Sequence, residues 1–505
     1  MSELAIKLIN EAYEKKSTFL DLGNCGLEEV PKEIMKLKDT LQGLNLGPLY
    51  LSSNLYYNRC ENGFKNNRIA NNGQSLLLLK ELPFLTSLYL MANEIGDSET
   101  EYISQLSNLT VLSLSGNRMS ESGIKHLRRL SALTVLDLAG NEIGHKGAED
   151  ISTLSTLTSL RLYNNSIGDK GAASISQLPL LTLLDLGKNQ ISDQGVESFS
   201  RLSNLTILFL EENRIGDLGA AGLSRLSRLT SLSLSGNNIG NQGAEYLSHL
   251  TALTSLDLSN NNIGSPGAAC ISQLPILTDL NLAGNNIDKF DGIISPALKT
   301  FKLQNNLIEE LSVKFIKNSQ LEIDFELKNF GAGKIYLHGN PVKNVPREVL
   351  DKGRSAILEY LSGALKPLNE CKLIFVGDGS VGKTSLMKRL VYGEFNSCEI
   401  TTHGINKIAW KGIKNEQGES IKVNCWDFGG QHIQHSLHQF FFTQRVVYVL
   451  VLNPRNDERA GYWLDQIDKL GHNSQIIIVY NWKNKQDIQA DYLRNFRELR
   501  KTYTH

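Results

Sequence analysis

The chain has 505 residues and a formal net charge of −1, with 52 Lys and Arg against 53 Asp and Glu. This length exceeds one ordinary hydrophobic core and predicts several domains or a repeat array. The balanced charge argues against a nucleic-acid partner, and no apolar stretch reaches the roughly 18 residues that a membrane span requires.

The N-terminal segment and the cysteines indicate in which cellular compartment the protein is expected. Residues 1–16 lack the apolar core of a signal peptide. The six cysteines form no C-x-x-C pair, which argues against structural zinc and favours reduced thiols. We therefore expect a cytoplasmic protein.

A repeat dominates the first two thirds of the chain. The string L-x-x-L-x-L-x-x-N-x-[IM] recurs every 24 residues, and its first leucine stands at 85, 109, 133, 157, 181, 205, 229, 253 and 277. This is the leucine-rich repeat signature. In each copy L-x-L predicts a short strand with buried leucines, the asparagine predicts a turn, and the following segment predicts a convex helix. We expect a solenoid over residues 1–344, regular from about 85 to 296.

The flanking repeats are less regular, as terminal repeats of a solenoid usually are. Residues 17–27 form a repeat with Cys25 in the asparagine place, and residues 41–51 begin a repeat that loses its asparagine. Residues 52–75 predict an insertion or loop. Residues 298–308 and 335–346 predict variant repeats at the other end.

The concave face of such an array is the expected protein-binding surface. Its exposed positions flank the two leucines of each strand, and aromatic and arginine side chains are the usual anchors of an interface. These positions give the candidate partner-binding residues Tyr89, Arg161, Tyr163, Ile207, Phe209 and Glu211. The alternative is ordinary solvated sheet surface.

Residues 345–369 predict a linker helix, because Val349, Leu350, Ile357, Leu358 and Leu361 follow helical spacing. A second domain, 370–505, then begins with an apolar strand and a phosphate-binding loop. The string GDGSVGKT fits G-x-x-x-x-G-K-[ST] at every fixed position and precedes a helical stretch. The expected nucleotide-binding residues of this loop are Gly377, Asp378, Gly379, Ser380, Val381, Gly382, Lys383, Thr384 and Ser385.

A second motif, WDFGGQH, follows a predicted strand. Asp427 and the hydroxyls of Thr384 and Thr402 are expected to hold Mg²⁺. The Gly430 N–H is expected to meet the γ-phosphate, and Gln431 to orient the attacking water as the catalytic residue.

The guanine-reading motif has two alternative registers. The resemblance of these motifs to those of Ras-like GTPases, in which this motif directly follows a strand, implies that the motif begins at Asn481 after the apolar strand 476–480, with Asn484 in the place of the carboxylate. Three residues later stands a full N-K-x-D match. We favour this second register, in which Asn484, Lys485 and Asp487 bind guanine.

These motifs resemble the N-terminal part of a Roco protein, in which leucine-rich repeats precede a Roc (Ras of complex proteins) domain. The matching strings are GDGSVGKTSL, THGI, WDFGGQ, HQFFFTQR and YWLDQIDKLG. The resemblance implies an α/β chain that binds GTP or GDP with Mg²⁺, hydrolyses GTP slowly and dimerises. It also implies a COR domain after Roc.

The chain departs from this family pattern in two further ways. His432 stands where similar domains usually carry Glu, and the chain stops at His505 before the last Ras-like elements and COR. We therefore expect a Roc domain that is incomplete at its C-terminus. A GTP-binding switch with an interaction surface is the favoured function. The alternative is a repeat scaffold with a degenerate, non-hydrolysing GTPase remnant.

Overall fold

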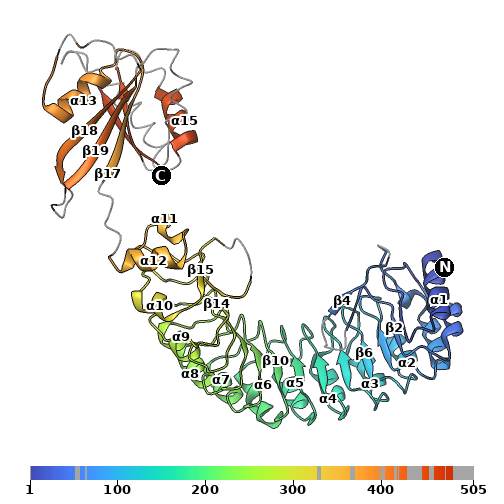
Figure 1. Cartoon of the computed structure of the whole chain (residues 1–505). Coiled ribbons are helices and arrows are strands. Elements are labelled where there is room, and N and C mark those ends of the chain that lie inside the picture. Colours follow the sequence, from blue (N-terminus) through green and yellow to red (C-terminus); the bar gives the residue numbers. More distant parts are fainter. Residues whose placement is uncertain are drawn as a thin grey trace, which may run out of the picture. The chain divides into compact units, whose positions relative to one another are not determined.

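The computed structural model describes the residues 2–51, 57–62, 65–326, 331–363, 370–396, 399, 404–414, 418, 420–428, 446–453, 460–471 and 474–481. The chain divides into two compact units, Met1–Leu365 and Lys366–His505. The first unit is the repeat array and the second carries the phosphate loop (Figure 1). Among the described residues no helix is long and apolar enough to cross a membrane.

A parallel sheet forms the concave side of the first unit. Neighbouring strands pair in a register of 24 residues through the regular repeats, so Leu136 faces Leu160 and Leu160 faces Leu184. The leucines of the repeats are buried in one continuous core. In order across the sheet, the strands are β1 (Phe19–Asp21), β2 (Gly43–Asn45), β5 (Ser87–Tyr89), β6 (Val111–Ser113), β7 (Val135–Asp137), β8 (Ser159–Arg161), β9 (Leu183–Asp185), β10 (Ile207–Phe209), β11 (Ser231–Ser233), β12 (Ser255–Asp257), β13 (Asp279–Asn281), β14 (Thr300–Lys302), β16 (Lys334–Tyr336) and β15 (Glu322–Asp324).

Short helices line the convex side (Figure 1). Close packing between the helices from α3 to α9 needs a glycine near each helix start: a Cβ on Gly171 would lie 2.5 Å from Ile167 Cγ2 and 3.0 Å from Ala148 Cβ. The helices are α2 (Asp97–Ile103), α3 (Glu121–Leu127), α4 (Gly144–Ile151), α5 (Gly168–Ile175), α6 (Asp193–Val196), α7 (Asp217–Leu223), α8 (Asn241–Leu247) and α9 (Ser265–Ile271), with 3₁₀ segments at η1 (Lys32–Leu37), η2 (Ile69–Glu81) and η3 (Glu197–Arg201).

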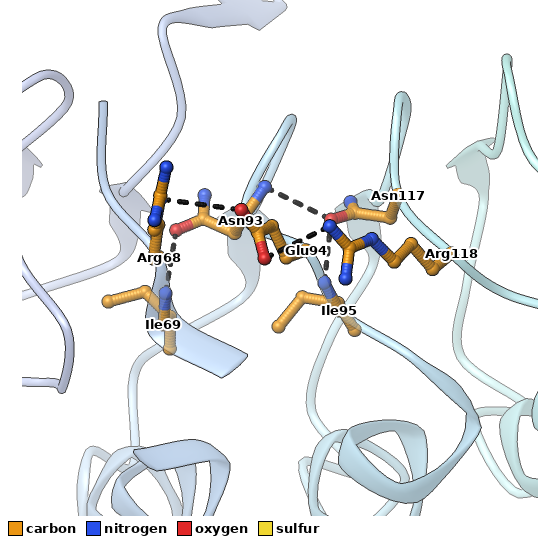
Figure 2. A network of polar contacts seen from close by, with 7 residues as sticks. All are labelled: Arg68, Ile69, Asn93, Glu94, Ile95, Asn117 and Arg118. Atoms are coloured by element: carbon orange, nitrogen blue, oxygen red, sulfur yellow. Dashed lines mark hydrogen bonds and ion pairs between the residues drawn. The ribbon is translucent and has the colours of Figure 1, made fainter. Parts of the chain in front are cut away.

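The repeat asparagines join each coil to the one before it through side-chain hydrogen bonds. We call this series of bonds the asparagine ladder. Asn117 Nδ2 donates to the carbonyls of Leu90 and Leu114 at 2.9 and 2.8 Å. Its Oδ1 accepts the N–H groups of Asn93 and Ile95 at 3.0 and 2.9 Å (Figure 2). All of these groups are buried, so each asparagine satisfies backbone groups that water cannot reach.

An ion network crosses the same turns on the outside of this ladder. Glu94, in the left-handed region at φ 60°, lies between Arg68 at 3.3 Å and Arg118 at 3.1 Å (Figure 2). The two arginine side chains are largely exposed and Glu94 is partly exposed, so solvent screening makes the contribution of these ion pairs to stability small beside that of the buried ladder.

The irregular second repeat keeps an asparagine after all. Asn67 is 2% exposed, accepts the Leu27 N–H at 2.7 Å and donates to the carbonyls of Leu22 and Leu46 at 2.9 and 2.8 Å. The prediction that this repeat loses its asparagine is therefore wrong. An insertion containing the antiparallel pair β3 (Leu49–Leu51) and β4 (Tyr57–Arg59) displaces the asparagine along the sequence while the ladder stays intact.

Both ends of the repeat core are capped. Helix α1 (Glu3–Glu14) buries Ala5, Ile9 and Ala12 at the N-terminal end. At the other end Phe290 packs edge-on against Phe301 and Phe315, with ring centroids 5.3 and 5.1 Å apart. Aromatic side chains thus fill the place of the convex helix in this shortened repeat.

The prediction of a single linker helix over residues 345–369 is wrong in form, although the segment is helical. The structure has two short helices, α11 (Arg347–Leu350) and α12 (Arg354–Leu361), and Gly353, at a φ of 82°, is the N-cap residue of the second helix. Leu350 and Ile357 belong to the core of the repeats, and Arg354 Nε donates to the carbonyl of Ile316 in α10 (Val313–Asn318) at 3.2 Å. The two helices therefore cap the repeat array.

The second unit is a five-stranded sheet in the order β18-β19-β17-β20-β21. Only β18 is antiparallel to its neighbour among these described strands. The elements are β17 (Glu370–Val376), α13 (Lys383–Tyr392), β18 (Ile405–Lys414), β19 (Ser420–Phe428), β20 (Val447–Leu452), α15 (Ala460–Gly471) and β21 (Gln475–Tyr480). Met387 of α13 packs on one face, and Trp463 and Ile467 of α15 pack on the other.

The asparagine ladder gives a test of the repeat core. Replacing Asn117 with Ala leaves five buried backbone groups without its amide, so we expect the free energy of unfolding to fall by about 1–3 kcal/mol or more. Urea denaturation followed by circular dichroism measures this loss.

The matched control is Asn262→Ala, because Asn262 lies in an equivalent turn but has an exposed side chain, which donates to the Asn238 side chain. We expect that variant to stay within about 0.5 kcal/mol of the unaltered chain. Equal losses in both variants would contradict the importance of the buried ladder.

Candidate functional site

The phosphate loop lies between β17, the central strand of the sheet, and the start of α13. Its backbone takes conformations that favour glycine, with φ of 139° at Gly377 and 90° at Gly382. A Cβ on Gly377 would lie 2.2 Å from the carbonyl oxygen of Val451, so only glycine lets the loop pass the end of β20. Ser380 also lies in the left-handed region, at φ 62°. Such a loop presents successive N–H groups to an anion.

Lys383 is drawn into the loop. Its side chain is 6% exposed, and Nζ donates to the carbonyls of Gly377 and Asp378 at 2.9 and 2.8 Å. Burial lowers the pKa of Lys383, while the carboxylates of Asp427 and Asp378 raise it. The ammonium thus lies inside the loop, where phosphate oxygens would arrive.

Thr384 and Asp427 meet at the same end of the sheet. Thr384 Oγ1 donates to Asp427 Oδ2 at 2.5 Å. Asp427 is fully buried near the end of β19, paired with Phe375 of β17 in the parallel ladder. A hydroxyl and a carboxylate are hard oxygen ligands, so the pair fits Mg²⁺.

Asn481 anchors the phosphate loop from the end of β21. Its Nδ2 donates to the Val381 carbonyl at 2.8 Å, and its backbone N–H donates to the Leu452 carbonyl at 2.9 Å. The sequence placed Asn481 at the start of the first register of the guanine motif. The structure brings this residue to the loop.

The remaining predicted site residues lie outside the described part of the chain. They are Thr402, Gly430, Gln431, Asn484, Lys485 and Asp487, together with His432. Their roles stay predictions.

One contact at the loop was missed by sequence reasoning. Trp463 of α15 is 1% exposed, and its Nε1 donates to Asp378 Oδ1 at 3.3 Å. Trp463 belongs to the string YWLDQIDKLG, which indicated only the family resemblance. The signal that could have predicted the contact is an indole N–H in a helix that packs near a phosphate loop.

The concave face carries a compact polar patch around β8 to β10. Lys188 Nζ lies 5.4 Å from the Tyr163 ring centroid and 3.2 Å from Glu212 Oε1. A Cβ on Gly187 would lie 2.7 Å from the Tyr163 ring and 3.1 Å from Glu211 Oε2, so both side chains lie over this glycine. Arg161, Ile207 and Phe209 are half-buried on the same face.

Carboxyl groups lie close together in this patch. Burial raises the pKa of Glu211, a hydrogen bond with Ser233 lowers it, and the charges of Asp185 and Asp257 raise it further. Burial likewise raises the pKa of Asp185, against the lowering effects of the Gly187 N–H and Arg161.

Tyr89 does not belong to an exposed surface. It is 6% exposed, because Tyr50 of the insertion and Phe19 of β1 pack against it with ring centroids 6.2 and 6.3 Å away. The prediction that Tyr89 is an exposed concave position is therefore wrong, and the insertion is the reason.

Comparison with protein families identifies both units. Residues 372–487 match the family model described as "Ras of Complex, Roc, domain of DAPkinase", and residues 110–323 match a leucine-rich repeat region. The chain joins leucine-rich repeats to a Roc domain. The predicted resemblance to the Roco family and the predicted α/β fold class are thereby confirmed.

Individual relatives agree with this assignment. The chain is 31% identical over 170 residues to the probable serine/threonine-protein kinase pats1 of Dictyostelium discoideum, covering 29% of this chain and 5% of that protein. It is 28% identical over 216 residues to leucine-rich repeat serine/threonine-protein kinase 1 of Mus musculus, covering 38% and 11%. The chain therefore spans a small part of the length of these relatives.

A solved structure is also similar to part of this chain. The structure of Methanosarcina barkeri Roco2 RocCORdC bound to GDP is 43% identical, covers 27% of this chain and 41% of that chain, and has a TM-score of 0.25.

Proposed function

We propose that this chain is a guanine-nucleotide switch of the Roco type, whose Roc domain binds GTP or GDP with Mg²⁺. The observation that carries the proposal is the meeting of Lys383 and the Thr384–Asp427 pair at one end of the sheet. The ammonium would contact the β- and γ-phosphates. Thr384, Asp427 and Thr402 would hold Mg²⁺, and Gly430 would contact the γ-phosphate.

The base would be read by the segment 481–487. The Asn481 contact with Val381 supports the placement of this segment beside the phosphate loop. Guanine recognition needs a carboxylate that accepts two base N–H groups, and Asp487 is the only acidic residue in the segment. In this proposal Asn481 anchors the segment, while Asn484, Lys485 and Asp487 contact the base.

The repeats would provide a protein-interaction surface. The half-buried patch of Arg161, Tyr163, Ile207, Phe209 and Glu211 supports this role, because aromatic and arginine side chains in partly desolvated positions are typical interface anchors. Self-association through a homodimer and a cytoplasmic location complete the proposal. Light scattering with and without nucleotide tests the dimer, and imaging of a fluorescently tagged chain tests the location.

Nucleotide binding should depend on Lys383. Lys383→Ala removes the ammonium inside the loop, and losing a charge-assisted contact costs about 1.5–3 kcal/mol, so GDP affinity should fall at least tenfold. Isothermal titration with and without Mg²⁺ measures this. The control is Lys469→Ala, since Lys469 lies on exposed α15 surface with Asp465. Equal GDP affinity in the Lys383 variant and the unaltered chain would refute the site, and absence of binding in both would favour a scaffold without a working GTPase.

Base selectivity should depend on Asp487. Replacing it with Ala should reduce GDP affinity by about 1–3 kcal/mol, by analogy with other bidentate base contacts, and leave ADP affinity unchanged. Competition between GDP and ADP measures the selectivity. If Asn484→Ala abolishes selectivity while Asp487→Ala retains it, the base is read in the register that begins at Asn481.

Hydrolysis should be slow. Gln431 can orient a water molecule, but no recognisable motif supplies an arginine to the transition state, so turnover of the order of 10⁻⁴ per second is expected. Single-turnover assays of GTP conversion measure the rate, with Lys383→Ala as the blank. Turnover above about one per second by the chain alone would contradict this expectation.

A further inference from the structure

The phosphate loop contains an acidic side chain beside the cation that should bind phosphate. Asp378 follows the first glycine of the loop, and its backbone carbonyl accepts Lys383 Nζ at 2.8 Å. Its carboxylate is close enough to raise the pKa of Lys383. An anion within reach of this ammonium is a competitor of the nucleotide.

The Asp378 carboxylate and the nucleotide compete strongly for Lys383, because its ammonium has few N–H donors left. A lysine ammonium carries three N–H donors. Two of them point to the carbonyls of Gly377 and Asp378. A third donor serves either an arriving phosphate oxygen or a carboxylate that turns toward it. The orientation of the Asp378 side chain therefore decides how much of the lysine a nucleotide can use.

Trp463 fixes that orientation from the opposite side. Its indole Nε1, which can only donate, bonds Asp378 Oδ1 at 3.3 Å. The ring is 1% exposed and belongs to the core formed with Ile374, Val376 and Leu464. A side chain packed in this way has little rotational freedom, so the N–H is a fixed point of attachment on α15.

We propose that Trp463 is a positioning residue of the nucleotide site, which holds the Asp378 carboxylate on the α15 side and thereby keeps Lys383 accessible to phosphate. This inference rests on the proposed nucleotide site and adds to it a residue that the nucleotide-binding motifs do not contain. Trp463 acts through Asp378, and it contacts neither phosphate nor base in this proposal.

A double-mutant cycle on the full chain tests the inference. Trp463→Phe keeps an aromatic ring and removes the N–H, so GDP affinity with Mg²⁺ should fall about tenfold as Asp378 turns to the ammonium. Asp378→Asn removes the competing charge and should tighten GDP binding. In the Asp378→Asn background, the Trp463→Phe change should have no further effect, since no carboxylate remains to be held. A lost packing contact could not be rescued in this way.

Two further measurements separate positioning from folding. The loss in Trp463→Phe should shrink as ionic strength rises, because it comes from competition between charges. Trp410→Phe is the matched control, since this half-buried indole lies on β18, an edge strand of the sheet, and belongs to none of the nucleotide-binding motifs. That variant should bind GDP as the unaltered chain does.

The possible failures are distinguishable. Absence of GDP binding by the unaltered chain would overturn both the proposed function and this inference. Unchanged affinity in Trp463→Phe, or an equal loss with and without the Asp378 carboxylate, would overturn the inference alone. If Trp463→Phe fails to fold, Asp378→Asn still decides, because weaker GDP binding in that variant contradicts a competing role for the carboxylate.

Discussion

Side chains that donate hydrogen bonds to buried backbone carbonyls hold both units of this chain in shape. In the repeats, the asparagine amides bind carbonyls of their own coil and of the coil before it, as Asn117 does with Leu114 and Leu90. In the Roc domain, Lys383 and Asn481 do the same for carbonyls of the phosphate loop. Where water is excluded, the backbone N–H and C=O groups of a turn need hydrogen-bond partners within the protein. This requirement restricts which residue types can stand at the turn.

Where these hydrogen-bond partners stand at regular positions in the sequence, the structure could be predicted from the sequence. The repeat of 24 residues predicted the strands, the buried leucines and the turn at each asparagine. The phosphate-loop motif predicted the strand, the turn and the helix that contain it. Asn67 was not recognised as a repeat asparagine, because the insertion moves it away from the position that the repeat spacing predicts. The caps were also missed: the break at Gly353 and the burial of Ile357 depend on what the repeat core leaves uncovered.

The polar contacts around the nucleotide site show a related limit. Lys383, Thr384 and Asp427 were predicted together, since motif spacing encodes their roles. The contact between Trp463 and Asp378 joins residues 85 positions apart, and neither residue belongs to a motif that names the other. Long-range contacts of this kind depend on how a helix lies on a sheet, which sequence periodicity leaves undetermined.

The order of the last strands of the repeat sheet bears on how the chain is made. β15 pairs only with β16 among the described strands, and β16 lies between β14 and β15 although it is synthesised after both. While a ribosome makes the chain, the edge of β14 therefore stays open until residue 336 has emerged. Chaperones or neighbouring nascent chains would meet an unpaired strand during this interval. The last three strands of the sheet can therefore take their final order only after β16 has been made.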